Sequence, residues 1–197
     1  MSKQVEFFFD FGSPAAYLAW TQLPNIAAAA GATIVWRPML LGGVFKAAGN
    51  ASPISVAAKG KWMMADLARY AARYGVPLKF PASFPVNTLA LMRGALGMQM
   101  RQAADFDRYV SAIFQAIFAR GLAMGDPAVV AGVLSAAGLD GAGFEALIGD
   151  PAVKQGLIAN TEEAVARGAF GAPTMFVGDA MHFGQDRLDF VAQALAA

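Results

Sequence analysis

An aromatic run near the N-terminus constrains the fold of this chain more than any other feature. Residues 5–11 (VEFFFDF) predict a buried strand, and residues 12–14 (GSP) follow directly. Because serine is a favoured N-cap and proline a favoured first helical residue, we expect a helix to begin here. The helix should cover residues 15–30, with a break near Pro24, before a second strand at residues 33–36. A strand, a helix and a strand of this length form a βαβ unit with parallel strands.

Strand patterns return only near the C-terminus. Residues 174–177 and 180–183 are separated by Gly178-Asp179, which predicts a β-hairpin with a glycine-first type II′ turn. An amphipathic helix should follow. Between the two ends, we expect a loop from residue 42 to about residue 53, and residues of about 45–165 should be mostly helical.

The order of these elements predicts a single α/β sheet with a helical block inserted into it. The expected strands are residues 4–11, 33–38, 174–178 and 180–183. Within the helical block, Asp126-Pro127 and Asp150-Pro151 each combine a favoured N-cap with a favoured first helical residue. They therefore predict the starts of two helices.

Composition argues against several classes of function. The sequence has no cysteine, so a disulfide, a thiolate zinc site and a redox thiol of the protein's own are excluded. The net charge of +1, without a basic run, argues against nucleic acid or an anionic membrane as a partner. The uncharged residues 11–36 include Pro14, Pro24 and Gly31, so no continuous apolar helix of about 20 residues fits. We expect a cytoplasmic protein with no membrane span and, from residues 1–4 (MSKQ), no secretory signal.

Four residues are candidates for chemistry. Ser13 lies at the predicted carboxyl edge of the sheet, where a helix N-terminus favours an anion, although an ordinary N-cap has the same pattern. Pro173 is a candidate for a cis peptide bond, although from its local pattern alone a trans proline in an edge strand is favoured. Asp186 is either the cap of the last helix or a carboxylate near a cleft. His182 is the only histidine, so no metal site is expected, and no nucleophile-elbow pattern surrounds Ser13.

Three motifs in this order resemble a known family. They are FDFGSP at residues 9–14, GAPTMF at residues 171–176 and FGQDRL at residues 183–188. Together they resemble the 2-hydroxychromene-2-carboxylate isomerases, which are relatives of the kappa-class glutathione transferases. The resemblance implies a DsbA-like thioredoxin fold with a large all-helical insertion.

In terms of that fold, the chain should divide into two parts. Residues 1–44 and 166–197 are expected to form the thioredoxin-like domain, and residues 45–165 the inserted helical domain. The family also suggests a homodimer.

The resemblance also implies a glutathione site. Ser13 resembles the serine that holds the glutathione sulfur, and Ala172 resembles the residue before a cis-proline whose backbone pairs with the cysteinyl part. Gln185 and Asp186 resemble the residues that bind the γ-glutamyl end. The expected glutathione-binding residues are Ser13, Ala172, Pro173, Phe183, Gly184, Gln185 and Asp186.

A small aromatic acid is the expected second substrate. Asn50 resembles a residue near the glycyl end of glutathione or near the second substrate, while Lys46, Ser55 and Phe84 fall near positions that touch the aromatic acid. The chain departs from the family pattern here: no arginine lies near Ser55, and Phe84 stands where a tyrosine is expected. These departures concern the identity of the substrate more than the glutathione site.

The implied activity is a glutathione-dependent cis/trans isomerisation of an aromatic-degradation intermediate, of the type that converts 2-hydroxychromene-2-carboxylate to trans-o-hydroxybenzylidenepyruvate. A thiol has a pKa of about 8.5 and reacts as the thiolate, which Ser13 and the helix N-terminus would favour. The thiolate would add to a conjugated enone, the former double bond would rotate, and elimination would return glutathione. Two alternatives stay open: a kappa-like glutathione transferase or peroxidase, and a non-catalytic thioredoxin-fold binding module.

Overall fold

A four-stranded mixed sheet, with the strand order β2-β1-β3-β4, forms the centre of the fold. The computed structural model of the chain describes residues 3–197, so Met1 and Ser2, which belong to the expected thioredoxin-like domain and to the residues from which no secretory signal is expected, lie outside the described residues. β1 and β2 are parallel, whereas β3 pairs antiparallel with both β1 and β4. The predicted sheet is therefore confirmed. The strands are β1 (Gln4–Phe9), β2 (Thr33–Pro38), β3 (Thr174–Val177) and β4 (Ala180–Phe183).

β1 ends two residues earlier than its aromatic pattern predicted. The strand stops at Phe9 because the chain turns at Asp10, whose carboxylate accepts the Gly12 N–H and whose carbonyl oxygen accepts the Ser13 N–H. Phe11 is fully buried although it lies outside the strand. The aromatic run therefore predicts the burial of these residues correctly but not the residue at which the strand ends.

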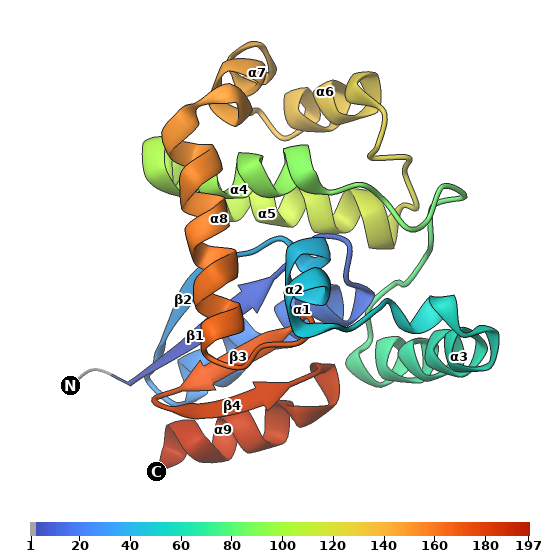
Figure 1. Ribbon diagram of the computed structural model, residues 1–197, viewed down its shortest axis with the longest axis vertical. Coiled ribbons are helices and arrows are strands. Elements are labelled where there is room, and N and C mark those ends of the chain that lie inside the picture. The colour runs from blue at the N-terminus through green and yellow to red at the C-terminus, as the bar shows by residue number, and fades with distance from the viewer. Residues whose placement is uncertain (1–2) are drawn as a thin grey trace.

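Helices cover both faces of the sheet (Figure 1). Phe7 and Phe9 point to the face covered by α1 and α9, while Phe8 points to the face covered by α2 and α8. Because neighbouring residues of a strand point to opposite faces, the run of three phenylalanines supplies both layers of the core. The covering helices are α1 (Pro14–Ala29), α9 (Leu188–Ala196), α2 (Leu41–Ala48) and α8 (Pro151–Ala166).

The loop predicted from residue 42 to about residue 53 is wrong in its first half, which is helix α2. Two adjacent glycines suggested a loop, but Gly43 marks close packing of α2 against α8, since a Cβ atom there would lie 3.0 Å from the Thr161 side chain. α2 ends at Ala48 and is followed by its C-cap, Gly49, whose φ of 63° is left-handed.

The block between β2 and β3 is mostly helical, as predicted. In Figure 1, α4 to α7 lie above the sheet and α3 stands to one side. Asp126 and Asp150 cap α6 and α8 as expected, each accepting an N–H of the first turn. None of the helices within residues 3–197 is both long and apolar enough to span a membrane. The remaining helices are α3 (Ala57–Tyr74), α4 (Leu89–Arg101), α5 (Phe106–Phe114), α6 (Pro127–Ala136) and α7 (Gly141–Gly149).

The predicted break at Pro24 is wrong, because α1 continues through this residue and the buried Leu23 and Ala27 keep the helix packed on the core.

The division into two domains stays a prediction. Its boundary at residue 44 falls inside α2, and the rings of Phe9 and Phe114, one from each side, have centroids 5.9 Å apart in one core cluster.

Candidate active site

Ser13 ends the connection between β1 and α1 and is the N-cap of α1. Its Oγ accepts the Ala16 N–H at 3.1 Å, which satisfies one of the free donors of the first turn. The residue is 5% exposed. The helix dipole places partial positive charge at this end, so an anion next to Ser13 is stabilised.

The Ser13 hydroxyl also reaches the loop before β3. It donates to the Ala172 carbonyl oxygen at 2.8 Å, and the peptide bond between Ala172 and Pro173 is cis. The prediction of a cis bond facing Ser13 is therefore confirmed. The Ala172 N–H has no hydrogen-bond partner among residues 3–197, so a backbone donor remains for an extended ligand.

The turn after β4 lies against the same loop. The Gly184 N–H donates to the Pro173 carbonyl oxygen at 3.1 Å. Gln185 is buried, and its carbonyl oxygen accepts the hydroxyl of Tyr74, the last residue of α3, at 2.7 Å. The structure thus joins the first and last predicted motifs and attaches α3 to them.

Asp186 lies in a short 3₁₀ turn, Gln185–Arg187, and is not the N-cap of α9, so that alternative is wrong. Its carboxylate pairs with the neighbouring Arg187 at 2.6 Å. Asp186 also lines a cavity of about 290 Å³, together with Tyr70, Arg73 and Asp189. A ligand cation can therefore reach this carboxylate by replacing an exposed arginine.

Asn50 and Phe183 meet the segment that leads to Ala172. The Asn50 amide donates to the Phe170 carbonyl oxygen at 2.9 Å. The rings of Phe170 and Phe183 have centroids 4.5 Å apart, and a Cβ atom at Gly171 would lie 2.8 Å from the Phe183 ring. Both residues thus border the predicted glutathione site.

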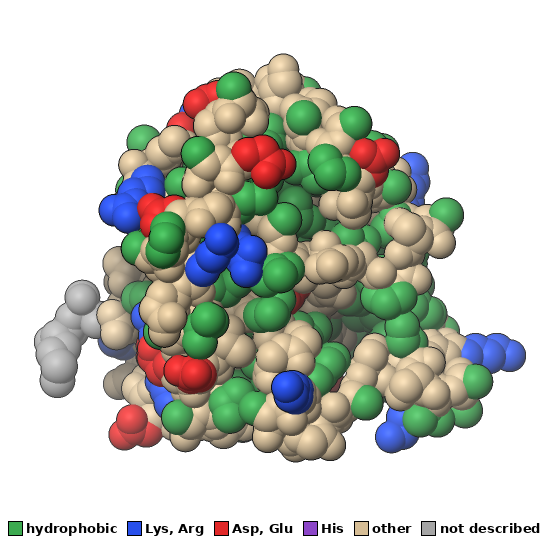
Figure 2. All heavy atoms as spheres, turned by 45° about the horizontal axis from the view of Figure 1, so that its top comes forward, with side chains coloured by type: hydrophobic (Ala, Val, Ile, Leu, Met, Phe, Trp, Pro, Cys, Tyr) green, Lys and Arg blue, Asp and Glu red, His purple; other side chains and the backbone are tan. Residues whose placement is uncertain are grey.

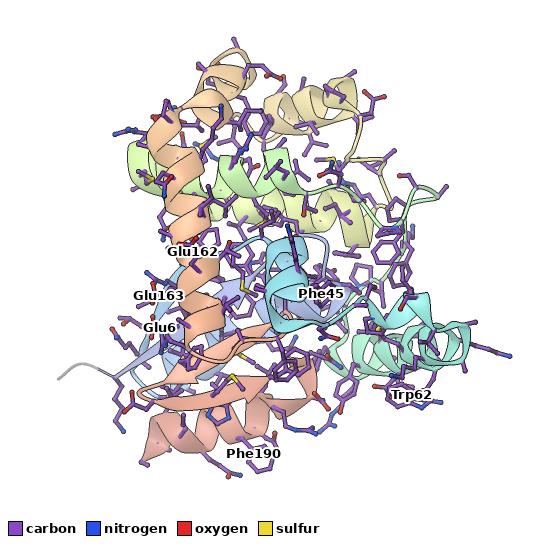
Figure 3. All side chains as sticks on the ribbon, in the orientation of Figure 1. Glu6, Phe45, Trp62, Glu162, Glu163 and Phe190 are labelled. Atoms are coloured by element: carbon purple, nitrogen blue, oxygen red, sulfur yellow. The ribbon has the colours of Figure 1, made fainter. Side chains whose placement is uncertain are left out.

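The remaining predicted substrate residues are more dispersed. Lys46 is exposed on α2, close along the chain to Phe45, which Figure 3 labels on this helix. The Ser55 hydroxyl donates to the Ser52 carbonyl oxygen. Phe84 packs among other rings, with centroid distances of 5.1 Å to Phe80 and 6.4 Å to Phe118. Contact of Lys46, Ser55 and Phe84 with an aromatic acid stays a prediction.

Asp10 is the residue of this site that the sequence analysis did not single out. It is 1% exposed, and its carboxylate accepts hydrogen bonds of 2.7 Å from the Gly12 N–H, the Leu41 N–H and the Thr88 hydroxyl. Burial raises the pKa of the carboxyl, while the Thr88, Gly12 and Leu41 donors oppose that shift. The sequence signal was a carboxylate between Phe9 and Phe11 in an aromatic run that predicts burial, where an unpaired charge is costly.

His182 is not paired with Ser13. Its Nε2 is buried without a hydrogen-bond partner among residues 3–197, and burial lowers the pKa of the imidazole. In the sheet it lies opposite Met175, whose side chain belongs to the core on the α9 side. A serine–histidine pair is therefore not present.

These groups fit glutathione, a tripeptide with a thiol, an ammonium group and two carboxylates. Ser13 and the start of α1 suit a thiolate, the free Ala172 N–H suits a peptide carbonyl, and Asp186 suits the ammonium group. On the face shown in Figure 2, basic side chains are dispersed and do not form one continuous patch.

A mixed four-stranded sheet, an inserted helical block and a capping serine beside a cis-proline define a thioredoxin-like protein of the DsbA type. A family model described as "DSBA-like thioredoxin domain" matches residues 4–196. A solved structure of 2-hydroxychromene-2-carboxylate isomerase is similar, with a TM-score of 0.85 and 35% identity over 98% of this chain and 94% of that one.

Two relatives narrow the assignment. The 2-hydroxychromene-2-carboxylate isomerase of Sphingobium xenophagum is 39% identical over 99% of both chains. Glutathione S-transferase kappa 2 of Caenorhabditis elegans is 29% identical over 98% of this chain and 92% of its own. The chain therefore belongs to the DsbA-like thioredoxin family and, within it, to the family of the 2-hydroxychromene-2-carboxylate isomerases.

Proposed function

We propose that this protein is a glutathione-dependent cis/trans isomerase of an aromatic-degradation intermediate of the 2-hydroxychromene-2-carboxylate type. The observation that supports this most is the Ser13 hydroxyl, at the N-terminus of α1 and 2.8 Å from the Ala172 carbonyl oxygen. Because the chain has no cysteine, a sulfur nucleophile at this position has to come from a ligand. Kappa-class glutathione transferases among the relatives support glutathione as that ligand.

The residues of the chain bind and orient this cofactor. When bound, glutathione would supply a thiolate nucleophile for reversible addition to a conjugated enone, the chemistry that a cis/trans isomerisation requires. The Ser13 hydroxyl turns from the Ala172 carbonyl oxygen towards the sulfur, and the dipole of α1 favours the same anion. Ala172 pairs with the peptide backbone of the ligand, and Asp186 binds its ammonium group in place of Arg187.

The second substrate is a small aromatic acid beside α2. Lys46 supplies a positive charge for a carboxylate, Asn50 and Ser55 supply polar contacts, and Phe84 supplies an aromatic edge. We further propose that the protein is a cytoplasmic homodimer. Within each chain, residues 45–165 would form the inserted helical domain.

A kappa-like glutathione transferase or peroxidase is the second candidate, favoured by the similarity to kappa-class transferases. The fate of glutathione separates the two, because an isomerase returns it whereas a transferase consumes it in a conjugate. A non-catalytic binding module with no glutathione site is the third candidate.

The deciding experiment is conversion of 2-hydroxychromene-2-carboxylate by the purified protein, with and without glutathione. We expect the trans product to form only with glutathione present and the glutathione concentration to stay constant. A glutathione conjugate would favour the transferase. No binding of glutathione in a calorimetric titration would contradict both enzyme proposals.

A further inference from the structure

We propose that Asp10 is a positioning residue: it holds the Ser13 loop and the starts of α2 and α4 together, and thereby sets the place of the Ser13 hydroxyl. The proposal deepens the role proposed above for Ser13 and rests on it. Asp10 itself touches no ligand in this account.

The contacts of Asp10 join three segments that are far apart in the sequence. One carboxylate oxygen accepts the Gly12 N–H and the Thr88 hydroxyl, and the other accepts the Leu41 N–H, each at 2.7 Å. The Asp10 carbonyl oxygen accepts the Ser13 N–H at 3.0 Å. Both polar ends of this residue therefore fix the turn that carries Ser13.

The partners of Asp10 lie at the starts of two helices and in the turn that carries Ser13. Thr88 is the N-cap residue of α4, but its side chain makes no capping bond to that helix and donates to Asp10 instead. Leu41 is the first residue of α2, so its N–H has no acceptor within the helix, and it donates to Asp10 instead. A Cβ atom on Gly12 would lie 3.3 Å from the Asp10 carboxylate and 3.5 Å from Thr88.

This arrangement is difficult to explain by stability alone. Burial of a carboxylate costs free energy that an apolar side chain of similar volume would avoid. What the carboxylate provides instead is fixed geometry, since its three hydrogen bonds hold three segments in place relative to one another. Those segments carry the proposed sulfur-holding residue Ser13 and, on α2, the proposed substrate residue Lys46.

Thr88→Val tests this positioning with little loss of packing, whereas Asp10→Ala would leave three donors unpaired and endanger folding. Thr161→Val is the matched control. Thr161 is 9% exposed against 7% for Thr88, and its Oγ accepts the Leu40 N–H, at the same end of α2, without contact to Asp10. Both variants thus remove one buried hydroxyl.

We expect Thr88→Val to raise the amide hydrogen-exchange rates of Gly12 and Leu41 by about tenfold, and to lower kcat by about tenfold with the KM for glutathione within about twofold. The pH at which bound glutathione ionises should rise in the same variant. Thr161→Val should leave kcat, this pH and the Gly12 exchange rate close to those of the wild type.

The positioning role would be overturned if Thr88→Val kept the exchange rates and kcat of the wild type. It would also be overturned if Thr161→Val raised the Gly12 exchange rate and lowered kcat as much as Thr88→Val does. If the wild type neither binds glutathione nor isomerises the substrate, the proposed function fails, and hydrogen exchange still decides the inference. Faster exchange at Gly12 in Thr88→Val alone then supports positioning, and unchanged exchange overturns it.

Discussion

The Ser13 hydroxyl and the Ala172 carbonyl oxygen, 159 positions apart in the sequence, are joined by a hydrogen bond of 2.8 Å. The same Oγ accepts the Ala16 N–H, so both hydrogen-bonding roles of the hydroxyl are occupied in the ligand-free protein. A ligand sulfur must therefore compete with Ala172 for the hydroxyl proton. The carbonyl oxygen has a second lone pair, so Ala172 can accept from a ligand while Ser13 is still bound to it.

Ser13→Cys should convert the proposed sulfur-holding position into a reactive thiol. A cysteine at a helix N-terminus has a lowered pKa. With oxidised glutathione, its thiolate should attack the disulfide, form a mixed disulfide and release one reduced glutathione. Because the chain has no other cysteine, intact-mass spectrometry should show addition of one glutathione per chain.

The matched control is Ser135→Cys, which places a thiol at an exposed position of α6 in the helical block. We expect Ser13→Cys to react at least about tenfold faster near neutral pH, because the helix N-terminus lowers the pKa of its thiol and the proposed site binds oxidised glutathione next to it. Reaction at or below the rate of Ser135→Cys would contradict a glutathione site at Ser13.

Asp186→Ala should weaken glutathione binding with little effect on the chemical step. Loss of a hydrogen bond to a charged group costs about 1.5–3 kcal/mol, so the KM for glutathione should rise by about ten- to a hundredfold. Steady-state kinetics with varied glutathione measures this, and kcat should change much less because the ammonium group that Asp186 is proposed to bind takes no part in the reaction at sulfur. Asp179→Ala, in the exposed turn between β3 and β4, is the control. Equal KM values in the two variants would exclude Asp186 from the binding site.

The buried Asp10 should make stability depend on pH. Burial raises the pKa of its carboxyl above the ordinary value for aspartate, so the carboxyl of the unfolded state ionises first as pH rises. Stability from this group is present below about pH 4 and is lost as pH rises through the folded pKa. The free energy of unfolding should be measured by urea denaturation across pH in the wild type and in Asp10→Asn. The other carboxyl groups are the same in both proteins, so the difference between the two free energies reports Asp10 alone. As pH rises, the wild type should lose free energy of unfolding relative to the variant. A gain in the free energy of unfolding of the wild type over Asp10→Asn as pH rises would contradict this, because the three hydrogen bonds would then lower the pKa of Asp10 more than burial raises it.

The packing of the helical block predicts opposite effects for two glycines. At Gly94 of α4, a Cβ atom would collide with the Tyr109 hydroxyl and lie 2.6 Å from the Phe144 ring, whereas nothing lies within 4 Å at Gly132 of α6. Gly94→Ala should cost about 1–3 kcal/mol by overpacking. Gly132→Ala should add about 0.5–1 kcal/mol of stability, because alanine favours helix more than glycine. Chemical denaturation compares the two, and similar values would contradict this packing.

The sheet could be predicted from the sequence because each strand is bounded by local signals. The aromatic run of β1, the glycine-first turn between β3 and β4, and the aspartate caps of α6 and α8 are all short-range patterns that the structure retains. Ser13 was likewise identified as a cap from its immediate neighbours. α2 was missed because Gly42 and Gly43 indicate a loop locally, while the reason for Gly43 is packing on Thr161.

The connections within the site could not be predicted in the same way. The contact of Asp10 with Thr88 spans 78 positions, and that of Tyr74 with Gln185 spans 111 positions. Neither end has a periodic pattern that indicates its partner. A second long-range cluster has the same character: Glu6 and Glu163, labelled in Figure 3, both pair with Arg37 and Arg167 and so attach α8 to the sheet. Such contacts follow from the tertiary fold.

The most direct test of the proposed function is the ionisation of bound glutathione, followed by thiolate absorbance against pH in the wild type and in Ser13→Ala. If Ser13 holds the sulfur, the variant loses a hydrogen bond to an anion, so the pKa of the bound thiol should rise by about one to two units. The rate at neutral pH should fall by about ten- to a hundredfold and recover in part at higher pH, since the dipole of α1 remains. If Ser13 is only an N-cap, the variant should lose about 1 kcal/mol of stability and leave the acidity of the thiol unchanged. Coincident titration curves would contradict the proposed role of Ser13.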